Sequence, residues 1–485
     1  MTSIEATTIS GTVRGTVEGG VARFLGIPYA AAPFGEHRFR PTQPHPGWSG
    51  VRDALQLGAT APAGPYPPVF RDVLPEPVIP GDEILTVNVW APADASGAPV
   101  MVFIHGGAFV NGSNAVPVYD GTAFARDGIV LVSVNYRLGA EGFLKLPGGP
   151  ANLGILDQVA ALTWVRDNIA AFGGDPGRVT VFGESAGAMS VGTLLAMPAA
   201  EGLFQRAILQ SGAAHNAYSV ETAEKIATLV AAQVGLAPAE LGQVPPERLV
   251  RAHTELLKEL RARPDPVKFG EAAAGALVYV PIVDGESLPG RPIDRIAAGS
   301  ATDVEVLIGT TRDEVHLFTV AGGMTEFVTD AAMTGFVGML GLPDGAVDRY
   351  RAGRPGGAPW EVLSDVMTDQ MFRIPAIRLA EAHGRAWVYE FDWPAQGLDG
   401  RLGACHAVEL PFVFDTLAAA EAMNGPDAPQ ELADTVHGAW VAFASGRDPG
   451  WARYGDARTV RTFGAATETA DDPRGATREL WAGVR

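Results

Sequence analysis

The amino-acid sequence predicts an α/β protein with a doubly wound, mostly parallel central sheet. Short runs at 99–104 (PVMVFI) and 129–134 (IVLVSV) are almost wholly apolar, as strands are when both faces of a parallel sheet are covered. Residues 153–172 repeat apolar side chains at spacings of three and four and are followed by Gly-Gly-Asp-Pro, which predicts an amphipathic helix and its end. Strands that alternate with helices are typical of this fold class.

Later runs extend the same sheet. A strand at 179–182 (VTVF) follows the helix, and the runs at 304–308 (VEVLI) and 386–391 (AWVYEF) are two further candidates for buried strands. Before the first of these strands, the chain through Pro80 is rich in Pro and Gly. We expect short strands and irregular wrapping in that part rather than a separate domain.

The chain is expected to form a single domain, residues 1–485, because no internal repeat and no long low-complexity linker divides it. The more polar helical ranges at about 218–265 and 324–382 are then insertions. In doubly wound sheets, ligands bind beyond the carboxyl ends of the parallel strands. We expect the two insertions to cover that site.

The composition excludes several classes of partner. Hydrophobic residues make up 47% of the 485 residues and charged residues 19%, which is a globular composition with ample material for a core. The net charge of −19 argues against nucleic acid and against an anionic membrane surface. The sequence also has no P-loop, no long basic block and no GxGxxG motif.

Targeting and metal-binding signals are missing as well. The opening residues MTSIEATTIS lack the cationic and apolar regions of a signal peptide, and no apolar stretch approaches the roughly 18 residues that span a bilayer. Cys405 is the single cysteine, so neither an intrachain disulfide nor a zinc cluster is expected. We expect a cytoplasmic protein with no cofactor, no metal and no membrane partner, as a monomer or weak homo-oligomer.

The motif Gly-Glu-Ser-Ala-Gly places Ser185 directly after the strand at 179–182 and before an apolar run with helical spacing. Strand, sharp turn and helix are the context that a nucleophile elbow requires. The flanking glycines avoid a Cβ clash in the turn, and the following helix N-terminus favours developing negative charge. The alternative is an ordinary helix-capping serine in a βα loop.

A second Gly-rich loop, His105-Gly106-Gly107-Ala108-Phe109, follows the buried strand that ends at Ile104. Small residues at a strand end leave backbone N–H groups free to face a ligand. Together with the N–H of Ala186, these groups would surround an oxyanion close to Ser185. The alternative is a simple Gly-rich turn.

A nucleophilic serine needs a base and an orienting acid. Among nine histidines, His406 in GACHAVELPFVF lies in a loop downstream of the last strong strand, while His215 and His316, each close behind a strand, are harder to dismiss than the others. The strand at 304–308 runs into a loop with Asp313 and Glu314. Serine, acid and histidine therefore follow in the order of an α/β-hydrolase. The residues alone leave both carboxylates open, as catalytic acid or as solvated loop charges.

Motifs along nearly the whole chain then resemble one family in order. They are GTVRGTVEGGVARFLGIPYAAAPFGEHRFRPTQP, VFIHGGAF, VSVNYRLGAEGFL, VFGESAGAMSV, IGTTRDEVHLF and CHAVELPFVFD. The sequence resembles the type-B carboxylesterase/lipase family of α/β-hydrolases, which includes the para-nitrobenzyl esterases and the cholinesterases. This resemblance implies the α/β-hydrolase fold, with helical insertions over the active site.

The resemblance also implies roles for single residues. In the family's Gly-x-x-x-Asp-Glu pattern the glutamate is the triad acid, which gives Ser185, Glu314 and His406 as the triad and makes Asp313 structural. The oxyanion hole is implied at the N–H groups of Gly107, Ala108 and Ala186, with Gly106 shaping its loop.

Further candidates concern the substrate pocket. Glu184, inside the elbow, is a family feature expected to act electrostatically. We expect the pocket walls to come from Phe109, from the insertions and from the segments after Glu314 and His406, which contribute Phe318 and Phe412. The substrate-binding candidates are thus Phe109, Glu184, Phe318 and Phe412.

Three departures from the family pattern carry information. The cysteines that secreted relatives have near Ala61 and in the segment 81–85 are missing here, which agrees with a reducing compartment. Ala108 replaces a glycine, as in the para-nitrobenzyl esterase branch, and cholinesterase-like aromatic gorge residues are not recognisable.

The activity that the resemblance implies is that of a serine carboxylesterase acting on a small-molecule ester, with a small acyl or aromatic group, through an acyl-enzyme. A carbamate or amide hydrolase using the same triad is the first alternative. A non-catalytic binding homologue is the second. Long-chain lipase activity is less attractive because no strongly apolar lid helix stands out.

Overall fold

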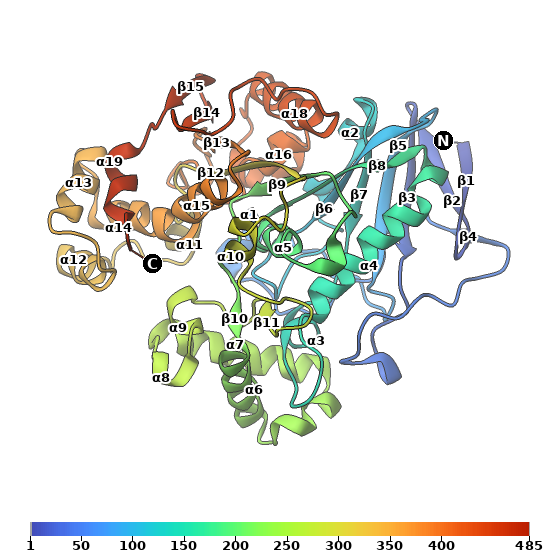
Figure 1. Cartoon of the computed structure of the whole chain (residues 1–485), viewed down its shortest axis with the longest axis horizontal. Helices are drawn as coiled ribbons and strands as arrows, with labels where there is room; N and C mark the ends of the chain where they lie inside the picture. Colours follow the sequence, from blue (N-terminus) through green and yellow to red (C-terminus); the bar gives the residue numbers. More distant parts are fainter. Residues whose placement is uncertain (1, 485) are drawn as a thin grey trace.

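The computed structural model describes residues 2–484, and in this range one sheet of 13 strands runs through the molecule (Figure 1). Its strands, in sheet order, are β1 (Thr2–Thr8), β2 (Gly11–Glu18), β3 (Val21–Pro28), β5 (Thr86–Pro92), β7 (Val130–Val134), β6 (Ala98–Ile104), β8 (Gly174–Glu184), β9 (Arg206–Gln210), β12 (Glu305–Thr311), β13 (Trp387–Phe391), β14 (Thr459–Phe463) and β15 (Glu468–Asp471), with β4 (Val51–Asp53) beside β2. From β7 to β14 the neighbours are parallel, and towards both edges they become antiparallel. The predicted doubly wound, mostly parallel sheet is confirmed.

The central strands are buried on both faces, which explains their apolar sequences. The runs predicted at 99–104, 129–134, 304–308 and 386–391 are β6, β7, β12 and β13. On one face of β6, Val100, Val102 and Ile104 join a core with helices that follow β7 and β8, and on the other face Met101 and Phe103 join a second core. The side-chain period of two along each strand thus feeds two hydrophobic layers.

The helices lie on both faces of this sheet and beyond its carboxyl ends. They are α1 (Pro68–Val73), α2 (Thr122–Arg126), α3 (Gly139–Phe143), α4 (Leu153–Asn168), α5 (Ala186–Leu194), α6 (Val220–Val234), α7 (Pro246–Ala262), α8 (Pro266–Phe269), α9 (Ala272–Gly275), α10 (Pro292–Ala297), α11 (His316–Ala321), α12 (Asp330–Met339), α13 (Ala346–Gly353), α14 (Pro359–Thr368), α15 (Ile374–His383), α16 (Leu410–Val413), α17 (Glu421–Asn424), α18 (Gln430–Ala444) and α19 (Gly475–Arg478). Residues of α4 and α5 pack in one core, and residues of α2, α16 and α18 pack in the other.

The two ranges expected to be insertions are helical. The first contains α6 and α7. The short strand β10 (Tyr218–Ser219) at its start pairs with β11 (Ile282–Val283), which follows it in the chain. The second contains α12 to α15. In Figure 1, α6 to α9 lie below the sheet and α12 to α14 lie at its left. α12 to α14 share a small hydrophobic core with the start of α15 and with the segment around Trp481, and this core includes Met333, Tyr350 and Val362.

The predicted helix at 153–172 is α4, which continues as a 3-10 turn over Ile169–Phe172 and ends at Gly173 with φ +82°. Unlike a simple amphipathic helix, α4 also buries polar side chains. Asp157 accepts hydrogen bonds from the Arg137 guanidinium at 2.7 and 2.8 Å, from the Arg137 N–H at 3.0 Å and from Thr42 at 2.6 Å. Neither member of the Arg137–Asp157 pair is more than 1% exposed.

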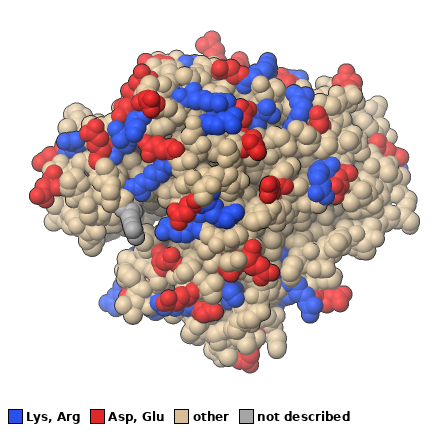
Figure 2. Space-filling model, in the orientation of Figure 1, with Lys and Arg blue, Asp and Glu red and all other residues tan. Residues whose placement is uncertain are grey.

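On the face of the molecule in Figure 2, acidic and basic side chains are interspersed among neutral ones. No continuous basic surface that would bind a polyanion stands out on this face. None of the helices between residues 2 and 484 is both long enough and apolar enough to cross a bilayer.

The buried Arg137–Asp157 pair gives a test of the fold. Asp157→Ala leaves a guanidinium buried without its counter-ion, so the free energy of unfolding should fall by about 3–5 kcal/mol. The measurement is urea denaturation followed by circular dichroism. The matched control is Asp167→Ala, which removes a more exposed carboxylate paired with Arg166 and should cost less than about 1 kcal/mol. Equal effects of the two substitutions would contradict this account.

Candidate active site

Ser185 occupies a sharp turn between β8 and α5. Its backbone has φ +55° and ψ −122°, a combination that is strained for any residue except glycine. Its N–H donates to the Gln210 carbonyl at 2.9 Å and its carbonyl accepts from the Met189 N–H at 2.9 Å. The strand and the helix thus hold the serine in its strained conformation, as in a nucleophile elbow.

The two glycines of the motif are needed for close packing rather than for a positive φ. A Cβ on Gly183 would come within 2.5 Å of the Gly187 carbonyl carbon, and a Cβ on Gly187 would overlap the Ile104 carbonyl oxygen at the end of β6. Neither glycine has a positive φ. The strain of the turn is therefore carried by Ser185 itself.

His406 and Glu314 form a short hydrogen bond at the ends of neighbouring strands. The His406 Nδ1 donates to Glu314 Oε2 at 2.6 Å, and Glu314 Oε1 accepts from the Thr311 N–H at 2.9 Å. Glu314 follows β12, and His406 lies in the loop after β13. Both side chains are buried, Glu314 completely.

Asp313, the neighbouring carboxylate, has different partners. It pairs with Arg312 at 3.0 Å and Arg354 at 2.5 Å, and it accepts from the Ala404 N–H at 3.1 Å. Burial by itself would raise the pKa of Asp313, but the positive charges of His316, Arg312 and Arg354 lower that pKa to about 2. Asp313 thus anchors the loop that carries His406 and does not contact the imidazole.

The other ring nitrogen of His406 faces Glu184. Nε2 lies 3.0 Å from Glu184 Oε1, although this contact lacks the angles of a hydrogen bond. Burial lowers the pKa of His406, but the negative charges of Glu184 and Glu314 outweigh it and raise that pKa well above its ordinary value. No hydrogen bond joins the Ser185 hydroxyl to His406 or to any other residue within 2–484, so the resting geometry leaves the serine free.

Sequence reasoning missed a third buried carboxyl, Glu409. It lies one turn after His406, and its Oε1 accepts from Gln210 Nε2 at 3.0 Å, while Gln210 Oε1 accepts from Trp440 Nε1 at 3.1 Å. Burial, and then the charges of Glu184 and Glu314, raise the pKa of Glu409 to about 8. Its carboxyl is therefore protonated at neutral pH and adds no third negative charge to the site. The i+3 spacing in His406-Ala-Val-Glu409 was the only signal in the sequence.

The Gly-rich loop after β6 has an unusual backbone. Gly107, Ala108 and Phe109 all have positive φ values, +112°, +54° and +62°. In the part of the chain that the structure describes, the amides of Gly107, Ala108 and Ala186 donate to no backbone carbonyl. Gly106 allows the loop to approach the elbow, because a Cβ there would lie 2.8 Å from the Glu184 carbonyl oxygen.

A segment that sequence reasoning left as irregular wrapping covers this loop. Residues 62–76, which include α1, line the cavity over the serine. Glu76 Oε1 accepts from Asn111 Nδ2 at 2.6 Å and from the Gly112 N–H at 3.3 Å. This segment and the Gly-rich loop are therefore held together by a side chain from each.

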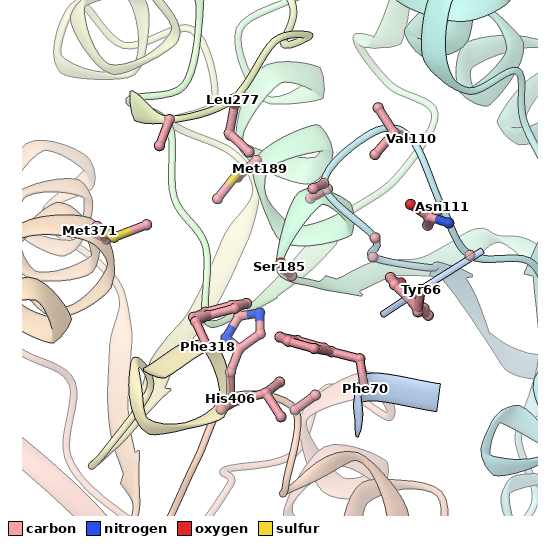
Figure 3. Close-up of a pocket in the computed structure, with 18 of the residues that line it drawn as sticks. Tyr66, Phe70, Val110, Asn111, Ser185, Met189, Leu277, Phe318, Met371 and His406 are labelled. Atoms are coloured by element: carbon pink, nitrogen blue, oxygen red, sulfur yellow. The ribbon is translucent and has the colours of Figure 1, made fainter. Parts of the chain in front are cut away.

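The serine, the imidazole of His406, Glu184 and the Gly-rich loop line one cavity of about 1240 Å³. Ser185, Ala186, Glu184, His406 and the loop 106–108 lie on its floor. Figure 3 shows the imidazole of His406 on the side of the cavity that faces Ser185, between Phe318 and Phe70. Tyr66, Phe70, Val110, Met189, Leu277 and Met371 supply further walls (Figure 3).

The substrate-binding candidates divide into two groups. Glu184 and Phe318 line the cavity. Phe109 and Phe412 do not, and for them the prediction was wrong: both are completely buried. Phe109 packs on Phe143 with ring centroids 4.8 Å apart, because its positive φ turns the side chain inward.

Phe412 belongs to the core for a different reason. It lies on α16 and packs against Phe391 and Trp393, with ring centroids 5.1 and 5.2 Å away.

The other candidate bases lie apart from the His406–Glu314 pair. His215 lines the cavity without a carboxylate contact, and His316 is buried with both ring nitrogens unbonded to residues within 2–484.

A serine in a strained turn after a central parallel strand, with a histidine–glutamate pair at neighbouring strand ends, is characteristic of an α/β-hydrolase. Residues 2–340 and 344–464 match the carboxylesterase family. The chain belongs to this family and is a carboxylic ester hydrolase.

Individual relatives agree over almost the whole length. The chain is 40% identical to the para-nitrobenzyl esterase of Bacillus subtilis, over 93% of this chain and 91% of that protein. It is 37% identical to the phenmedipham hydrolase of Pseudarthrobacter oxydans, over 92% and 90%. The crystal structure of a carboxylesterase from Geobacillus stearothermophilus superposes with a TM-score of 0.85 at 37% identity, covering 98% of this chain and 99% of that one.

The contact between Glu184 and His406 predicts a change in pH dependence. We expect His406 to be the catalytic base. Since a histidine base works only when neutral, activity should rise as the pH increases through the pKa of His406. Because the charge of Glu184 raises that pKa, Glu184→Gln should move the acidic limb of the kcat/KM profile to lower pH.

The measurement is the profile with a para-nitrophenyl ester whose own chemistry does not titrate. The matched control is Glu18→Gln, which changes an exposed carboxylate on β2, next to the edge strand β1 and separated from β8 by several strands. This substitution should leave the acidic limb of the kcat/KM profile in place. A limb that stays in place in Glu184→Gln would show that Glu184 does not set the pKa of His406.

Proposed function

We propose that the protein hydrolyses carboxylic esters with small acyl or aromatic groups, with Ser185 as nucleophile, His406 as base and Glu314 as the acid that orients it. The observation that carries the proposal is the 2.6 Å bond from His406 Nδ1 to Glu314 Oε2 in the cavity that also exposes Ser185. A buried carboxylate at Nδ1 fixes the tautomer that leaves Nε2 free to accept a proton.

In the first half of the proposed reaction, Ser185 Oγ attacks the ester carbonyl carbon and its proton passes to His406 Nε2. The carbonyl oxygen becomes the oxyanion of a tetrahedral intermediate. This intermediate collapses when the C–O bond to the alcohol breaks and Nε2 returns the proton to the departing oxygen. An acyl group then remains on Ser185.

In the second half, water attacks the acyl carbon as its proton passes to Nε2, and the acid leaves when Ser185 Oγ regains that proton. Both halves require Nε2 to face the serine rather than Glu184. The resting contact at 3.0 Å lacks hydrogen-bond geometry, so the ring breaks no hydrogen bond when it turns to the serine hydroxyl. Hydrogen bonds of this kind commonly tighten only in the substrate complex.

The oxyanion is proposed to lie on the N–H groups of Gly107, Ala108 and Ala186. Support comes from their place on the cavity floor and from the lack of any acceptor for them within 2–484. Preorganised donors of this kind stabilise the transition state because they need no reorientation as charge develops. The positive φ of Ala108 is the strain that this arrangement stores, while Gly107 adopts its positive φ freely.

Aromatic walls favour aromatic esters. The Phe70 ring stacks on both Tyr66 and Phe318, with centroids 6.3 Å apart in each pair, and the Phe318 ring lies 5.2 Å from His406. An aromatic leaving group next to His406 would pack against these rings. We also propose that the enzyme acts as a monomer or weak homo-oligomer.

The role of Ser185 is tested by Ser185→Ala. Without the nucleophile, kcat for para-nitrophenyl acetate should fall by about 10⁴-fold or more, and a fluorophosphonate probe should no longer label the protein. Circular dichroism should be unchanged. The control is Ser49→Ala, an exposed serine outside the cavity. Near-normal turnover by Ser185→Ala would sink the proposal.

The two neighbouring carboxylates should behave differently. Glu314→Gln disturbs the tautomer of His406 and should lower kcat by about 10⁴-fold with little change in unfolding temperature. Asp313→Asn weakens contacts with Arg312 and Arg354 and should lower the unfolding temperature while kcat falls much less. Steady-state kinetics and thermal denaturation of both variants decide the matter, and the reverse pattern would make Asp313 the acid.

A further inference from the structure

The cavity is far larger than the proposed chemistry needs, and it reaches well beyond the serine. Helix α7 turns one side to it over its whole length, from Pro246 through Leu249, His253 and Leu257 to Arg261. Arg291, before α10, and Arg378, on α15, line it as well. The cavity therefore has apolar walls and several cationic side chains, in a protein whose net charge is −19.

Two of these cations share a neighbourhood with His215. Burial, and then the positive charges of Arg378 and Arg291, lower the pKa of His215 to about 4, against a smaller opposing effect of Asp294. The imidazole is thus neutral at physiological pH, and its Nδ1 is buried without a hydrogen-bond partner among residues 2–484. The Ile293 N–H donates to the Ala214 carbonyl at 3.1 Å, and α10 packs on α15, so His215, Arg291 and Arg378 lie on one part of the cavity wall.

Within residues 2–484, neither arginine of this cluster forms an ion pair with a carboxylate. Within the described range, no ion pair or side-chain hydrogen bond involves Arg291. Among residues 2–484, the acceptors of Arg378 are the backbone carbonyls of Trp481, at 3.1 Å, and Val484. A guanidinium without a carboxylate partner on a cavity wall can form a bidentate pair with an incoming one.

The carboxylates that line the same cavity already have partners. Glu141 pairs with Arg38 at 2.5 Å, and Glu76 accepts from Asn111. Burial raises the pKa of Glu271, but hydrogen bonds from Ser219 and Thr222 and the charge of Arg291 outweigh it and lower that pKa. Glu271 accepts from the Ser219 N–H and hydroxyl at 2.7 and 2.8 Å. Glu184 contacts His406. The net character of the unsatisfied groups in this part of the cavity is therefore cationic.

We propose that His215, Arg291 and Arg378 bind a carboxylate carried by the ester substrate, so that the enzyme prefers esters whose acyl or alcohol part ends in a carboxylate. This inference rests on the proposed function at Ser185. The chain that joins the ester to its carboxylate would lie along the apolar walls, which include Met189, Leu277 and Met371 (Figure 3). Because the whole protein repels anions, such a preference must arise locally.

The test compares two para-nitrophenyl esters of suberic acid, the monoester with a free carboxylate and its neutral twin in which that carboxylate is a methyl ester. The wild-type protein should show a kcat/KM for the monoester at least tenfold above that for the twin, through KM, and the ratio should shrink at high salt. A second pair, acetate esters of 8-hydroxyoctanoic acid and of its methyl ester, tests the alcohol side.

The ratio of kcat/KM for the carboxylate ester to that for its neutral twin should fall close to one in Arg291→Gln and in the double variant Arg291→Gln/Arg378→Gln. This is expected for whichever substrate pair shows the preference in the wild-type protein. Arg166→Gln on α4, which removes one exposed charge outside the cavity, should keep the wild-type ratio. Thermal unfolding checks that the variants are folded. If the double variant does not fold, the single variant alone is used for the test. A wild-type ratio near one for both pairs, or a ratio that survives Arg291→Gln, would overturn the inference.

Failure of the protein to hydrolyse any of these esters would count against the proposed function instead. In that case calorimetry with suberate itself decides the inference. Binding that weakens at least tenfold in Arg291→Gln, but not in Arg166→Gln, would support an anion site, and equal binding by both variants would contradict it.

Discussion

The buried imidazole of His406, held between two carboxylates, is the interaction on which the rest of the site depends. Glu314 fixes Nδ1 at 2.6 Å, and Glu184 lies 3.0 Å from Nε2. The negative charges of Glu184 and Glu314 raise the pKa of this buried ring. A third negative charge beside them would be repelled by both. Glu409 avoids this because burial and those same charges keep it protonated. The basicity of the ring is therefore set by the two charged glutamates, Glu184 and Glu314.

The fold brings these groups together by placing strand ends side by side. β8 ends at the elbow, its neighbour β9 supplies the Gln210 carbonyl that holds the Ser185 N–H, and β12 leads to Glu314. Asp313 then anchors the loop after β13 through the Ala404 N–H. The cost of this convergence is local strain, seen as positive φ values at Ser185, Ala108 and Phe109.

Much of this was predictable from the sequence, and the failures have physical causes. The apolar runs became central strands, and the order of motifs led to the family. Side-chain direction was harder: Phe109 turns inward because of its positive φ, and Phe412 faces the core from α16. Contacts between distant segments, such as Glu76 with Asn111 or Gln210 with Glu409, leave no periodic pattern. The catalytic roles of Ser185, Glu314 and His406 stay predictions.

The central claim is that His406 Nε2 exchanges Glu184 for the reacting centre at Ser185 while the loop amides receive the oxyanion. A crystal structure of the protein inactivated by a fluorophosphonate tests it most directly. We expect phosphorus on Ser185 Oγ, its phosphoryl oxygen within hydrogen-bond distance of the Gly107, Ala108 and Ala186 N–H groups, and Nε2 turned from Glu184 towards the adduct. An adduct on another residue, or a phosphoryl oxygen that points away from these amides, would contradict the account.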